Sequence, residues 1–463
     1  MTRAGLHFRH WHLSSLVRLF SVSAVVFLTL SFSERKPSNC APDNAGLELP
    51  EGFCAQIVAD LLGKVRHVTV GPNGDIYVAA RTGTGNPGVI ALRDTDGDGD
   101  ADITQTFGSD GGSEVLYFEK HLYFASPRMV IRWSLDDTSL VPSTPPDTIV
   151  SGLLAYGQHG AKTFALGKDR AIYVNISAPS NTCQMKDRTL ESPGLDPCPW
   201  LDSAGGIWRF EIDRLRQRQR DGERWATGIR NIMALSMAPD GVTLFGVQHG
   251  RDNLQSDWPK LHSTKRAVEA PKEEFFRLEK EGDYGWPYCY FDAVLKKKIL
   301  NPEYGGDGKT AGRCAAARQP EMTFPAHWAP NSLLFYTGTS FPEKYRQGAF
   351  VAFHGSFNRA PLEQEGFNVV FVPFYDGRPS EDYEIFADGF RGAKDQMRHR
   401  PTGLALAPDG SLIVSDDAGG RIYRIRYNAP LSLLPESGFL RRNAKPRSAN
   451  RVTSFSSGSP EAR

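Results

Sequence analysis

The chain contains 463 residues, and its 54 Lys and Arg residues nearly balance its 53 Asp and Glu residues, giving a formal net charge of +1. This balance excludes nucleic acid and other polyanions as expected partners. Hydrophobic residues make up 40% of the chain and charged residues 23%, which excludes both a disordered chain and a membrane protein with several spans. The 45 Gly and 31 Pro residues, together with short apolar runs, favour an all-β protein with many tight turns.

The N-terminus has the order of a secretory signal. A basic stretch ends at Arg18, fourteen apolar or small residues follow at 19–32, and the chain becomes polar after Ser33. Because a membrane-spanning helix needs roughly 20 apolar residues, we predict a signal peptide at residues 1–33, with a retained anchor as the alternative. The protein is therefore expected to be periplasmic or secreted, with one folded domain at residues 34–427.

One pattern recurs beyond the signal: an alternating apolar strand, a turn, and a second apolar strand. The dipeptides Asn73-Gly74, Asp240-Gly241 and Asp409-Gly410 suit the positive φ angles of tight hairpins. Six such hairpins predict a six-bladed β-propeller, because a β-sandwich, the alternative, rarely requires about 400 residues. The predicted hairpins lie at 67–80, 114–126, 162–176, 234–248, 332–354 and 403–417.

An acidic loop follows the first hairpin, where five aspartates alternate with other residues around two glycines. Carboxylates in such a loop turn toward one cation, and leaving all of them unneutralised would be costly. We predict a structural calcium ion at a hairpin tip, with a solvated acidic turn as the alternative. Its candidate ligands are Asp94, Asp96, Asp98, Asp100 and Asp102.

The six cysteines all lie beyond the predicted signal peptide, and an even number in an exported chain is typical of a disulfide framework. They form neighbouring pairs separated by 14, 15 and 25 residues. The predicted disulfides are therefore Cys40–Cys54, Cys183–Cys198 and Cys289–Cys314. Four of these cysteines lie in long insertions at 177–206 and 249–331, which predicts stapled loops at one end of the propeller channel.

Three segments carry candidate chemistry. His159 precedes the third hairpin, where a lone histidine is more often structural. Arg230 and Asn231 precede the fourth hairpin, where a guanidinium and an amide suit a charged or carbonyl ligand. Gly250 and Arg251 follow that hairpin, and a glycine bend that frees backbone carbonyls beside carboxylates suits a hard cation.

The C-terminal segment 428–463 carries six basic residues against Glu436 and Glu461, and it contains few large apolar residues. This composition predicts a disordered basic tail, since such a segment buries too little apolar surface to fold. Contact with a membrane is expected only through an uncleaved N-terminus or through this tail.

Taken in order, the motifs resemble those of the glucose/sorbosone dehydrogenases, six-bladed propellers that use pyrroloquinoline quinone (PQQ). The resemblance covers about residues 48–427 and rests on the order of the motifs, since one alone is weak. After His159 and TFALGKDRAIYV come SAPSNTC (177–183), GIRN (228–231), HGRD (249–252), YGWPYC (284–289), HGSFNR (354–359) and RPTGLALAPDG (400–410). SAPSNTC and HGSFNR are more similar to the sorbosone dehydrogenase branch than to the glucose branch.

The resemblance implies a role for each candidate residue. His159 matches the catalytic base, Arg230 and Asn231 match the pair that contacts quinone and substrate, and the backbone carbonyls of Gly250 and Arg251 match ligands of a PQQ-bound calcium ion. The chemistry agrees, since a neutral imidazole with a pKa of roughly 6.5 suits removal of a hydroxyl proton while hydride leaves the same carbon. Calcium and Arg230 would stabilise the charge that develops on the quinone.

PQQ carries three carboxylates, so cations are expected around it. The candidates are Arg359, Arg398 and Arg400. Asn358 stands where the glucose dehydrogenase of this family has a lysine. The two PQQ-binding arginines of that enzyme match Arg398 and Arg400 only if a small gap is allowed. SAPSNTC also departs from the glucose branch, so the sugar specificity does not transfer.

The sequence therefore predicts an exported PQQ- and Ca²⁺-dependent dehydrogenase that oxidises an aldose or a sugar aldehyde and passes electrons to an external quinone or cytochrome. Two alternatives remain open. A calcium-dependent lactonase of the same fold would use a cage of Glu, Asn and Asp side chains on the channel axis. A non-catalytic sugar-binding propeller would be consistent with Asn358 in the lysine position.

Overall fold

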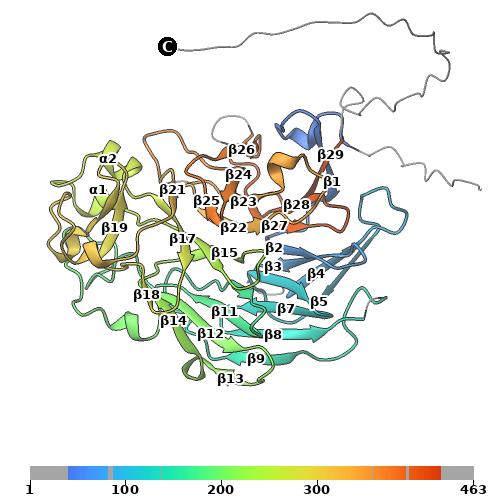
Figure 1. Ribbon diagram of the computed structural model, residues 1–463, viewed down its shortest axis with the longest axis horizontal. Coiled ribbons are helices and arrows are strands. Elements are labelled where there is room, and N and C mark those ends of the chain that lie inside the picture. Colours follow the sequence, from blue (N-terminus) through green and yellow to red (C-terminus); the bar gives the residue numbers. More distant parts are fainter. Residues whose placement is uncertain (1–39, 82–86, 137, 357, 393–395, 429–463) are drawn as a thin grey trace, which may run out of the picture. The chain divides into compact units, whose positions relative to one another are not determined.

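The computed structural model describes residues 40–81, 87–136, 138–356, 358–392 and 396–428. The predicted signal peptide at 1–33 and residues 429–463 of the predicted tail lie outside the described residues. Within the described ranges the chain forms six sheets of four or five strands and one two-stranded hairpin. The six sheets are the blades of a β-propeller, which confirms the predicted fold (Figure 1).

The first three blades follow one another along the chain. The first contains β2 (Val65–Val70), β3 (Ile76–Ala80), β4 (Val89–Arg93) and β5 (Ile103–Phe107). The second contains β6 (Glu114–Phe118), β7 (His121–Ser126), β8 (Met129–Ser134), β9 (Asp147–Ser151) and the parallel strand β13 (Gln217–Arg218). The third contains β10 (Phe164–Leu166), β11 (Ala171–Ile176), β12 (Gly206–Glu211), β14 (Glu223–Thr227) and the parallel strand β18 (Gly282–Asp283).

The last three blades continue this order. The fourth contains β15 (Ile232–Met237), β16 (Leu244–Gln248), β17 (Glu273–Leu278) and β21 (Met322–Phe324). The fifth contains β22 (Pro330–Phe335), β23 (Gly348–Phe353) and β24 (Asn368–Tyr375), with β25 (Arg378–Pro379) and β26 (Glu384–Ala387) both paired to β24. The sixth contains β27 (Pro401–Leu406), β28 (Leu412–Asp416), β29 (Arg421–Tyr427) and β1 (Phe53–Ala59).

The sixth blade combines strands from both ends of the described chain. β1 pairs antiparallel with β29, so that Phe53 lies opposite Tyr427. This pairing closes the ring of blades and covers the outer edge of β29. The Phe53 ring forms edge-to-face contacts with Phe341, Tyr345 and Phe386, at centroid distances of 4.8, 5.4 and 4.9 Å. Burial of each such ring contributes about 1.5–3 kcal/mol, so aromatic packing stabilises the closed ring.

Each of the six predicted hairpins forms the first two strands of one blade. The first strand of each blade is the innermost: β2 lies beside β6 and β27, and β22 lies beside β15 and β27. The second strands β3 and β23 are buried along their whole length, because neighbouring blades cover both of their faces. At the predicted turn Asp240-Gly241, the glycine has a φ of +70°, as a tight hairpin requires.

All three predicted disulfides are confirmed, as Cys40–Cys54, Cys183–Cys198 and Cys289–Cys314. The insertion predicted at 177–206 connects β11 to β12. The insertion predicted at 249–331 is divided, because β17 and β21 within it belong to the fourth blade. β17 was not predicted from the sequence because it starts with two acidic residues, Glu273 and Glu274. Both carboxylates are buried in the structure.

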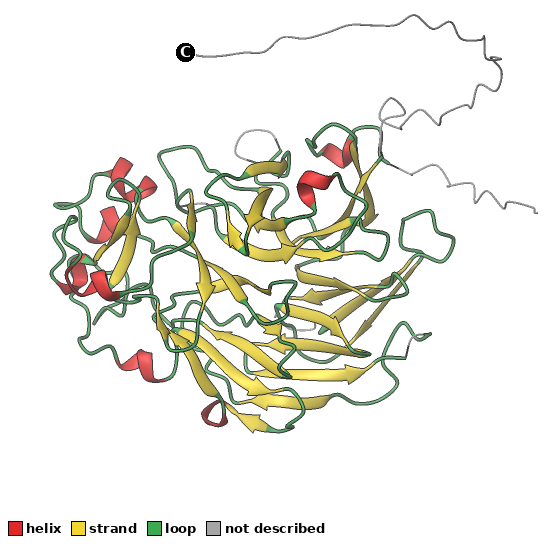
Figure 2. Cartoon of the chain, viewed as in Figure 1, coloured by secondary structure: helices red, strands yellow, loops and turns green. Residues whose placement is uncertain are grey.

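Short helices lie in the connections between strands, not within the blades (Figure 2). The α-helices are α1 (Leu254–Asp257) and α2 (Thr264–Glu269), and the 3₁₀ helices are η1 (Asn44–Gly46), η2 (Pro199–Asp202), η3 (Gln219–Asp221), η4 (Pro302–Tyr304), η5 (Gly312–Ala316) and η6 (Glu343–Tyr345). The hairpin β19 (Cys289–Asp292) and β20 (Lys297–Leu300) belongs to the second insertion.

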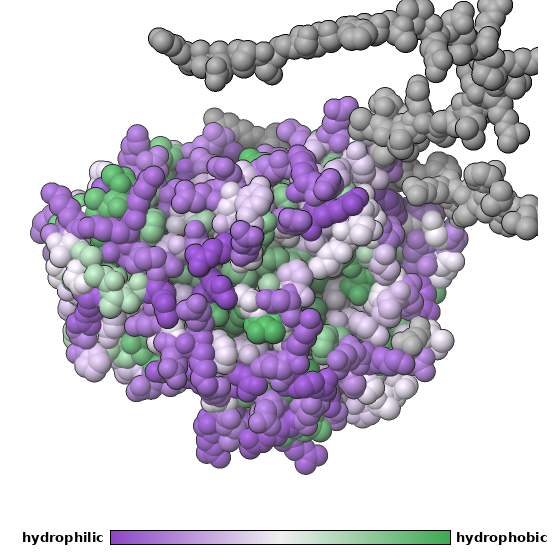
Figure 3. Space-filling model, in the orientation of Figure 1, coloured by the Kyte–Doolittle hydropathy of each residue, from purple (hydrophilic) through white to green (hydrophobic). Residues whose placement is uncertain are grey.

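The surface seen in Figure 3 is mainly hydrophilic, with hydrophobic residues scattered between polar ones. In the part of the chain that the structure describes, no helix combines the length and the apolar composition that crossing a membrane requires.

Candidate functional site

A cavity of about 590 Å³ lies where the inner strands begin. Every blade contributes to its lining at or near the start of its first strand, so the cavity lies on the axis around which the blades are arranged. The contributing residues, from the first blade to the sixth, are Arg66, Ser113, Ala161, Asn231, Asn331 and Arg400. The lining mixes charged, polar and glycine residues, which suits a polar ligand.

His159 lines this cavity. Its Nδ1 atom lies 2.7 Å from the backbone oxygen of Ala178 in the first insertion. Because a carbonyl oxygen only accepts hydrogen bonds, Nδ1 carries the hydrogen, and the lone pair of the neutral ring is on Nε2. The pKa of His159 is lowered to about 3 because the ring is buried and because the Arg230 guanidinium is near. The geometry therefore provides a neutral imidazole with a defined tautomer.

A second cavity histidine, His249, has a similar environment. Its Nε2 atom lies 2.8 Å from the backbone oxygen of Pro330, so Nε2 carries the hydrogen in the neutral ring. Burial and the Arg230 charge lower the pKa of His249 to about 4.

We expect both imidazoles to remain neutral when the pH of the protein solution is lowered from 8 to 5. A lowered pKa means that protonation begins only near the lower value, about 3 for His159 and about 4 for His249. A histidine in an unfolded peptide, with a pKa of about 6.5, is almost fully protonated at pH 5. Nitrogen chemical shifts of histidine-labelled protein, assigned with His159→Asn and His249→Asn, measure this. A midpoint between pH 6 and 7 for either ring would contradict it.

Arg230 extends from the segment before β15 and is 3% exposed. Its Nη2 donates to Asp252 Oδ2 at 2.9 Å, and its Nε donates to Asn181 Oδ1 at 3.2 Å. The bend before it requires Gly228, which has a φ of +73° and where a Cβ would lie 2.1 Å from Asp283 Oδ1. Arg230 is thus a buried cation held from two sides in the cavity wall.

Asp252 is the centre of a network that the sequence did not reveal. Its carboxylate accepts from Arg230 and from Arg188, each at 2.9 Å, and from Asn358 Nδ2 at 3.0 Å, while His327 Nδ1 lies 3.6 Å away. Burial favours a higher pKa for Asp252, but the Arg230 charge, together with His327 and Arg188, outweighs burial and holds the pKa well below its usual value. In the sequence, only the position of Asp252 at the end of the motif HGRD pointed to a role in the site.

The predicted neighbour Asn231 also lines the cavity and is 5% exposed. Its Oδ1 accepts from Ser177 Oγ at 2.7 Å, and its backbone oxygen accepts from the His249 amide at 2.9 Å. The amide side chain is therefore held by the first insertion, as His159 is. The structure brings His159, Arg230 and Asn231 to one cavity.

Gly250 lines the cavity, whereas Arg251 is not among the lining residues. The Gly250 amide donates to Glu273 Oε2 at 2.7 Å. Glu273 is 2% exposed and lines the same cavity, and burial raises its pKa to about 7. A Cβ at Gly250 would lie 2.6 Å from Pro271 O and 2.7 Å from Lys272 O, so backbone and carboxylate oxygens gather around this glycine.

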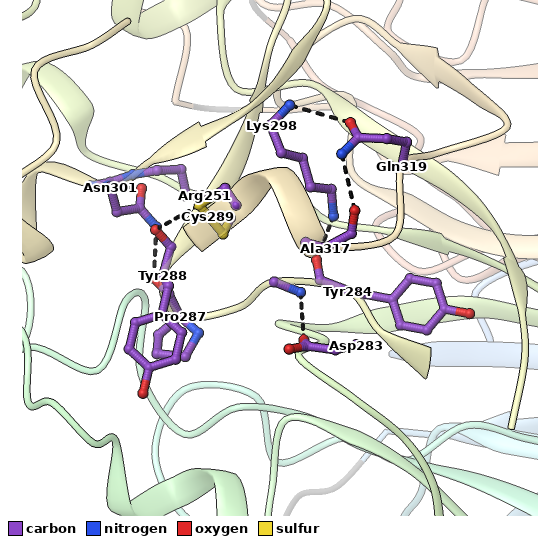
Figure 4. Close-up of a disulfide and its surroundings, with 12 residues drawn as sticks. Arg251, Asp283, Tyr284, Pro287, Tyr288, Cys289, Lys298, Asn301, Ala317 and Gln319 are labelled. Carbon is purple, nitrogen blue, oxygen red and sulfur yellow. Dashed lines mark hydrogen bonds between the residues drawn. A yellow bond between two sulfur atoms is a disulfide. The ribbon is translucent and has the colours of Figure 1, made fainter. Parts of the chain in front are cut away.

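The backbone after Gly250 is anchored in the second insertion. The buried Arg251 guanidinium donates to Glu303 Oε2 at 2.8 Å and to Asn301 Oδ1 at 2.7 Å, and Asn301 in turn donates to Pro287 O at 2.7 Å. Figure 4 shows Arg251 and Asn301 beside the Cys289 disulfide. This disulfide-stapled loop thus supports the cavity wall from behind.

The predicted cofactor-binding residues are divided by the fold. Arg400 and Asn358 line the cavity. Arg359 lies outside the lining, where it donates to Ala326 O at 3.3 Å and pairs with Glu365 at 2.8 Å. Arg398 is exposed and also lies outside the lining.

Arg66 and Asp417 form a second charged group in the cavity that the sequence did not reveal. Asp417 accepts from Arg66 Nη1 at 2.9 Å and contacts His354 Nε2 at 2.7 Å. Burial lowers the pKa of Arg66, whereas the nearby Asp417 charge counteracts it. The cavity wall therefore contains two buried Arg–Asp pairs, Arg66–Asp417 and Arg230–Asp252.

The acidic loop at 94–102 lies between β4 and β5, away from this cavity. Ligand atoms of Asp94, Asp96 and Asp102 lie within 4.8 Å of one another. Asp98 accepts from the Asp100 amide at 2.8 Å, and Asp100 Oδ1 accepts from Gln56 at 2.9 Å. The calcium site at this hairpin tip stays a prediction.

Comparison with known proteins relates the chain to a protein family and to a partial relative. A family model described as TrAA12-like matches residues 47–428. A protein of Borreliella burgdorferi is 29% identical over 203 residues, which are 44% of this chain and 48% of that protein, so this chain spans about half the length of that relative.

Three solved structures share the fold at low identity. The holo PQQ domain of pyranose dehydrogenase from Coprinopsis cinerea is 19% identical, with a TM-score of 0.67 and coverage of 82% of this chain and 97% of that chain. A Trichoderma reesei protein of Carbohydrate-Active Enzymes Family AA12 is 18% identical, with a TM-score of 0.67 and coverage of 82% and 98%. The soluble aldose sugar dehydrogenase of Escherichia coli is 16% identical, with a TM-score of 0.55 and coverage of 81% and 99%.

Proposed function

Because this chain belongs to the TrAA12-like family, we propose that it is a PQQ- and Ca²⁺-dependent dehydrogenase that oxidises an aldose or a sugar aldehyde. The observation that carries the proposal is the cavity that unites the neutral His159 with the buried cation Arg230 and with Asn231. Family membership agrees with the resemblance in the ordered motifs, and the similar structures include a pyranose dehydrogenase PQQ domain and an aldose sugar dehydrogenase.

The cavity residues fit an anionic, planar cofactor. Arg66, Arg81, Arg230 and Arg400 all line the cavity, and guanidinium groups suit carboxylates because their planar forks form paired hydrogen bonds. We propose that Arg230, Arg400 and Asn358 hold PQQ from the wall, with Arg66 and Arg81 completing the positive lining. Arg359 and Arg398, which the sequence predicts to bind the PQQ carboxylates, both lie outside the cavity lining. When bound, PQQ supplies the quinone that accepts hydride from the sugar carbon.

We propose that His159 removes the proton of the sugar hydroxyl through Nε2. The bond from Nδ1 to Ala178 O fixes the tautomer that leaves the Nε2 lone pair available. Arg230, held by Asp252, supplies positive charge beside the reacting groups, and a buried cation acts more strongly there than in water. Asn231, oriented by Ser177, positions the sugar.

For calcium, we propose the backbone carbonyls of Gly250 and Arg251. Calcium prefers several oxygen ligands, and the surroundings of Gly250 are rich in oxygen atoms, including the Glu273 carboxylate. The five aspartates of the 94–102 loop are the proposed ligands of a separate, structural calcium ion.

The lactonase alternative is less well supported. Its carboxylate cage would need free acids on the axis, whereas two of the three acids in the cavity lining, Asp252 and Asp417, pair with Arg230 and Arg66. We also propose that the enzyme acts in the periplasm or outside the cell, because three disulfides form in an oxidising compartment. Its electron acceptor would then be an external quinone or cytochrome.

Reconstitution tests this function. We expect the purified protein to reduce an artificial dye acceptor with glucose, galactose, xylose or sorbosone only when PQQ and Ca²⁺ are both added. Either addition alone is the control, and gluconolactone without PQQ tests the lactonase. Hydrolysis of the lactone with no dye reduction would contradict the dehydrogenase, and PQQ binding without turnover on any sugar would favour a binding protein.

A further inference from the structure

Two aromatic rings stack at the surface beside the candidate site. Tyr156 is 65% exposed, and its ring centroid lies 5.7 Å from that of Trp200 at an interplanar angle of 25°. A solvent-exposed aromatic surface of this kind is typical of a binding site, because its burial by a ligand is favourable. We call Tyr156 and Trp200 the aromatic platform.

The platform is built on the first disulfide-stapled insertion. Trp200 lies in η2, which begins directly after Cys198, and the Cys183–Cys198 disulfide holds this helix to the loop. One side of Trp200 packs against the small hydrophobic cluster that contains Ala178. The ring under Tyr156 is therefore fixed by packing, and little conformational entropy is lost when a ligand binds to it.

The platform is also close to the cavity. Tyr156 precedes His159 by three residues, so their Cα atoms lie at most about 11 Å apart. Gly157 has a φ of +77°, and a Cβ there would lie 2.0 Å from Pro179 O, so the chain passes tightly against the insertion. The Gln158 amide donates to Pro179 O at 3.2 Å, and Gln158 itself lines the cavity.

A hydrogen-bond chain holds this segment in place relative to the buried network. The Gln158 side chain donates to Asp187 at 2.8 Å and accepts from Arg188 Nε at 2.9 Å. Arg188 also donates to Asp252 Oδ2 at 2.9 Å. The backbone that carries Tyr156 is therefore connected to the same carboxylate that holds Arg230.

We propose that the aromatic platform is a second sugar subsite, so that the preferred substrates are oligosaccharides or glycosides and not free monosaccharides. A sugar ring presents C–H groups on its face, which pack on an aromatic ring, while Gln158 and Asp187 offer hydrogen bonds to its hydroxyls. A protein partner needs about 800 Å² on each side, more than two rings provide. This subsite rests on the proposed function, because it places the linked sugar of the substrate whose reacting ring occupies the cavity.

Tyr156→Ala tests the subsite in the reconstituted enzyme. We expect KM for maltose, cellobiose, lactose or xylobiose to rise about tenfold, as loss of one aromatic contact predicts, with kcat and the KM for glucose, galactose and xylose unchanged. Tyr156→Trp should retain a low KM for the disaccharides. The matched control is Tyr375→Ala, which removes a tyrosine that is 66% exposed on β24 and should change neither constant.

Calorimetric titration of the cofactor-free protein with the same disaccharides separates this proposal from the proposed function. Binding that is weakened by Tyr156→Ala, in a protein that oxidises no sugar, would support the subsite and contradict the dehydrogenase. Oxidation of monosaccharides with disaccharide constants unaffected by Tyr156→Ala would support the dehydrogenase and overturn the subsite. A Tyr156→Ala effect only on the KM of a protein electron acceptor would also overturn it.

Discussion

Asp252→Ala is expected to lower the free energy of unfolding by about 3 kcal/mol, since breaking a buried ion pair from one side typically costs this much. The substitution leaves the Arg230 guanidinium, in a side chain 4% exposed, without its carboxylate, and it removes one of several partners of Arg188. Sugar oxidation should be lost with it, because Arg230 is no longer held in the cavity wall. Urea denaturation with disulfides intact measures the stability change.

The pH dependence of this difference follows from the lowered pKa of Asp252. A carboxyl whose folded-state pKa lies below its unfolded value stabilises the protein fully above about pH 4 and loses this contribution as the pH falls toward the folded-state value. The stability difference between the wild type and Asp252→Ala should therefore stay constant from pH 8 to pH 5. A difference that already decreases between pH 7 and 6 would contradict the role of the ionised carboxylate.

Asp196→Ala is the matched control. Asp196 also pairs with an arginine, Arg313, at 2.6 Å, but both side chains are almost half exposed. Exposed ion pairs contribute little because water screens them, so this variant should unfold at nearly the wild-type urea concentration and keep its activity. Equal destabilisation by Asp196→Ala and Asp252→Ala would show that burial of the network is not what matters.

His159→Ala is expected to reduce the rate of sugar oxidation by about 10²- to 10⁴-fold, the usual contribution of a general base, while PQQ affinity is mostly retained. The substitution removes the ring whose Nε2 we propose as the proton acceptor. Steady-state dye reduction by the reconstituted enzyme measures the loss, and fluorescence titration with PQQ measures the affinity. Added imidazole should restore part of the rate, because the truncated side chain leaves space beside the cavity.

His262→Ala controls for the loss of any buried imidazole. His262 is 1% exposed, and burial lowers its pKa to about 4, but it lies outside the cavity lining. The folded fraction of the His262→Ala variant should therefore oxidise sugars at nearly the wild-type rate. Similar rates for His159→Ala and His262→Ala would reject His159 as the base.

Much of the fold could be predicted from local patterns. The hairpins at 67–80 and 403–417 were recognisable because alternating apolar residues and Asn-Gly or Asp-Gly turns act over a few positions. The three disulfides join cysteines no more than 25 residues apart, so neighbour pairing was correct. The exceptions were β17 and β21, which lie within the predicted insertion at 249–331. Two buried acids, Glu273 and Glu274, start β17.

The candidate site was only partly predictable. His159, Arg230 and Asn231 do line one cavity. Arg230 and Asn231 directly precede β15, and His159 lies five residues before β10, which is a local signal. Asp252 ends the motif HGRD, but nothing nearby in the sequence indicates that it holds Arg188 and Arg230. Arg359 and Arg398 were expected to be binding cations, yet both lie outside the lining.

The amino-acid sequence alone determined the repeated hairpins, their number and the local disulfides, because backbone periodicity and turn chemistry depend on adjacent residues. The tertiary structure decided which charged groups meet in the cavity and which are neutralised. Asn358 contacts Asp252 across 106 positions, and Arg66 contacts Asp417 across 351. The first contact joins neighbouring blades, whereas the second joins the first blade to the sixth and therefore needs the ring that β1 and β29 close. In the closed ring the starts of all six inner strands lie around one axis.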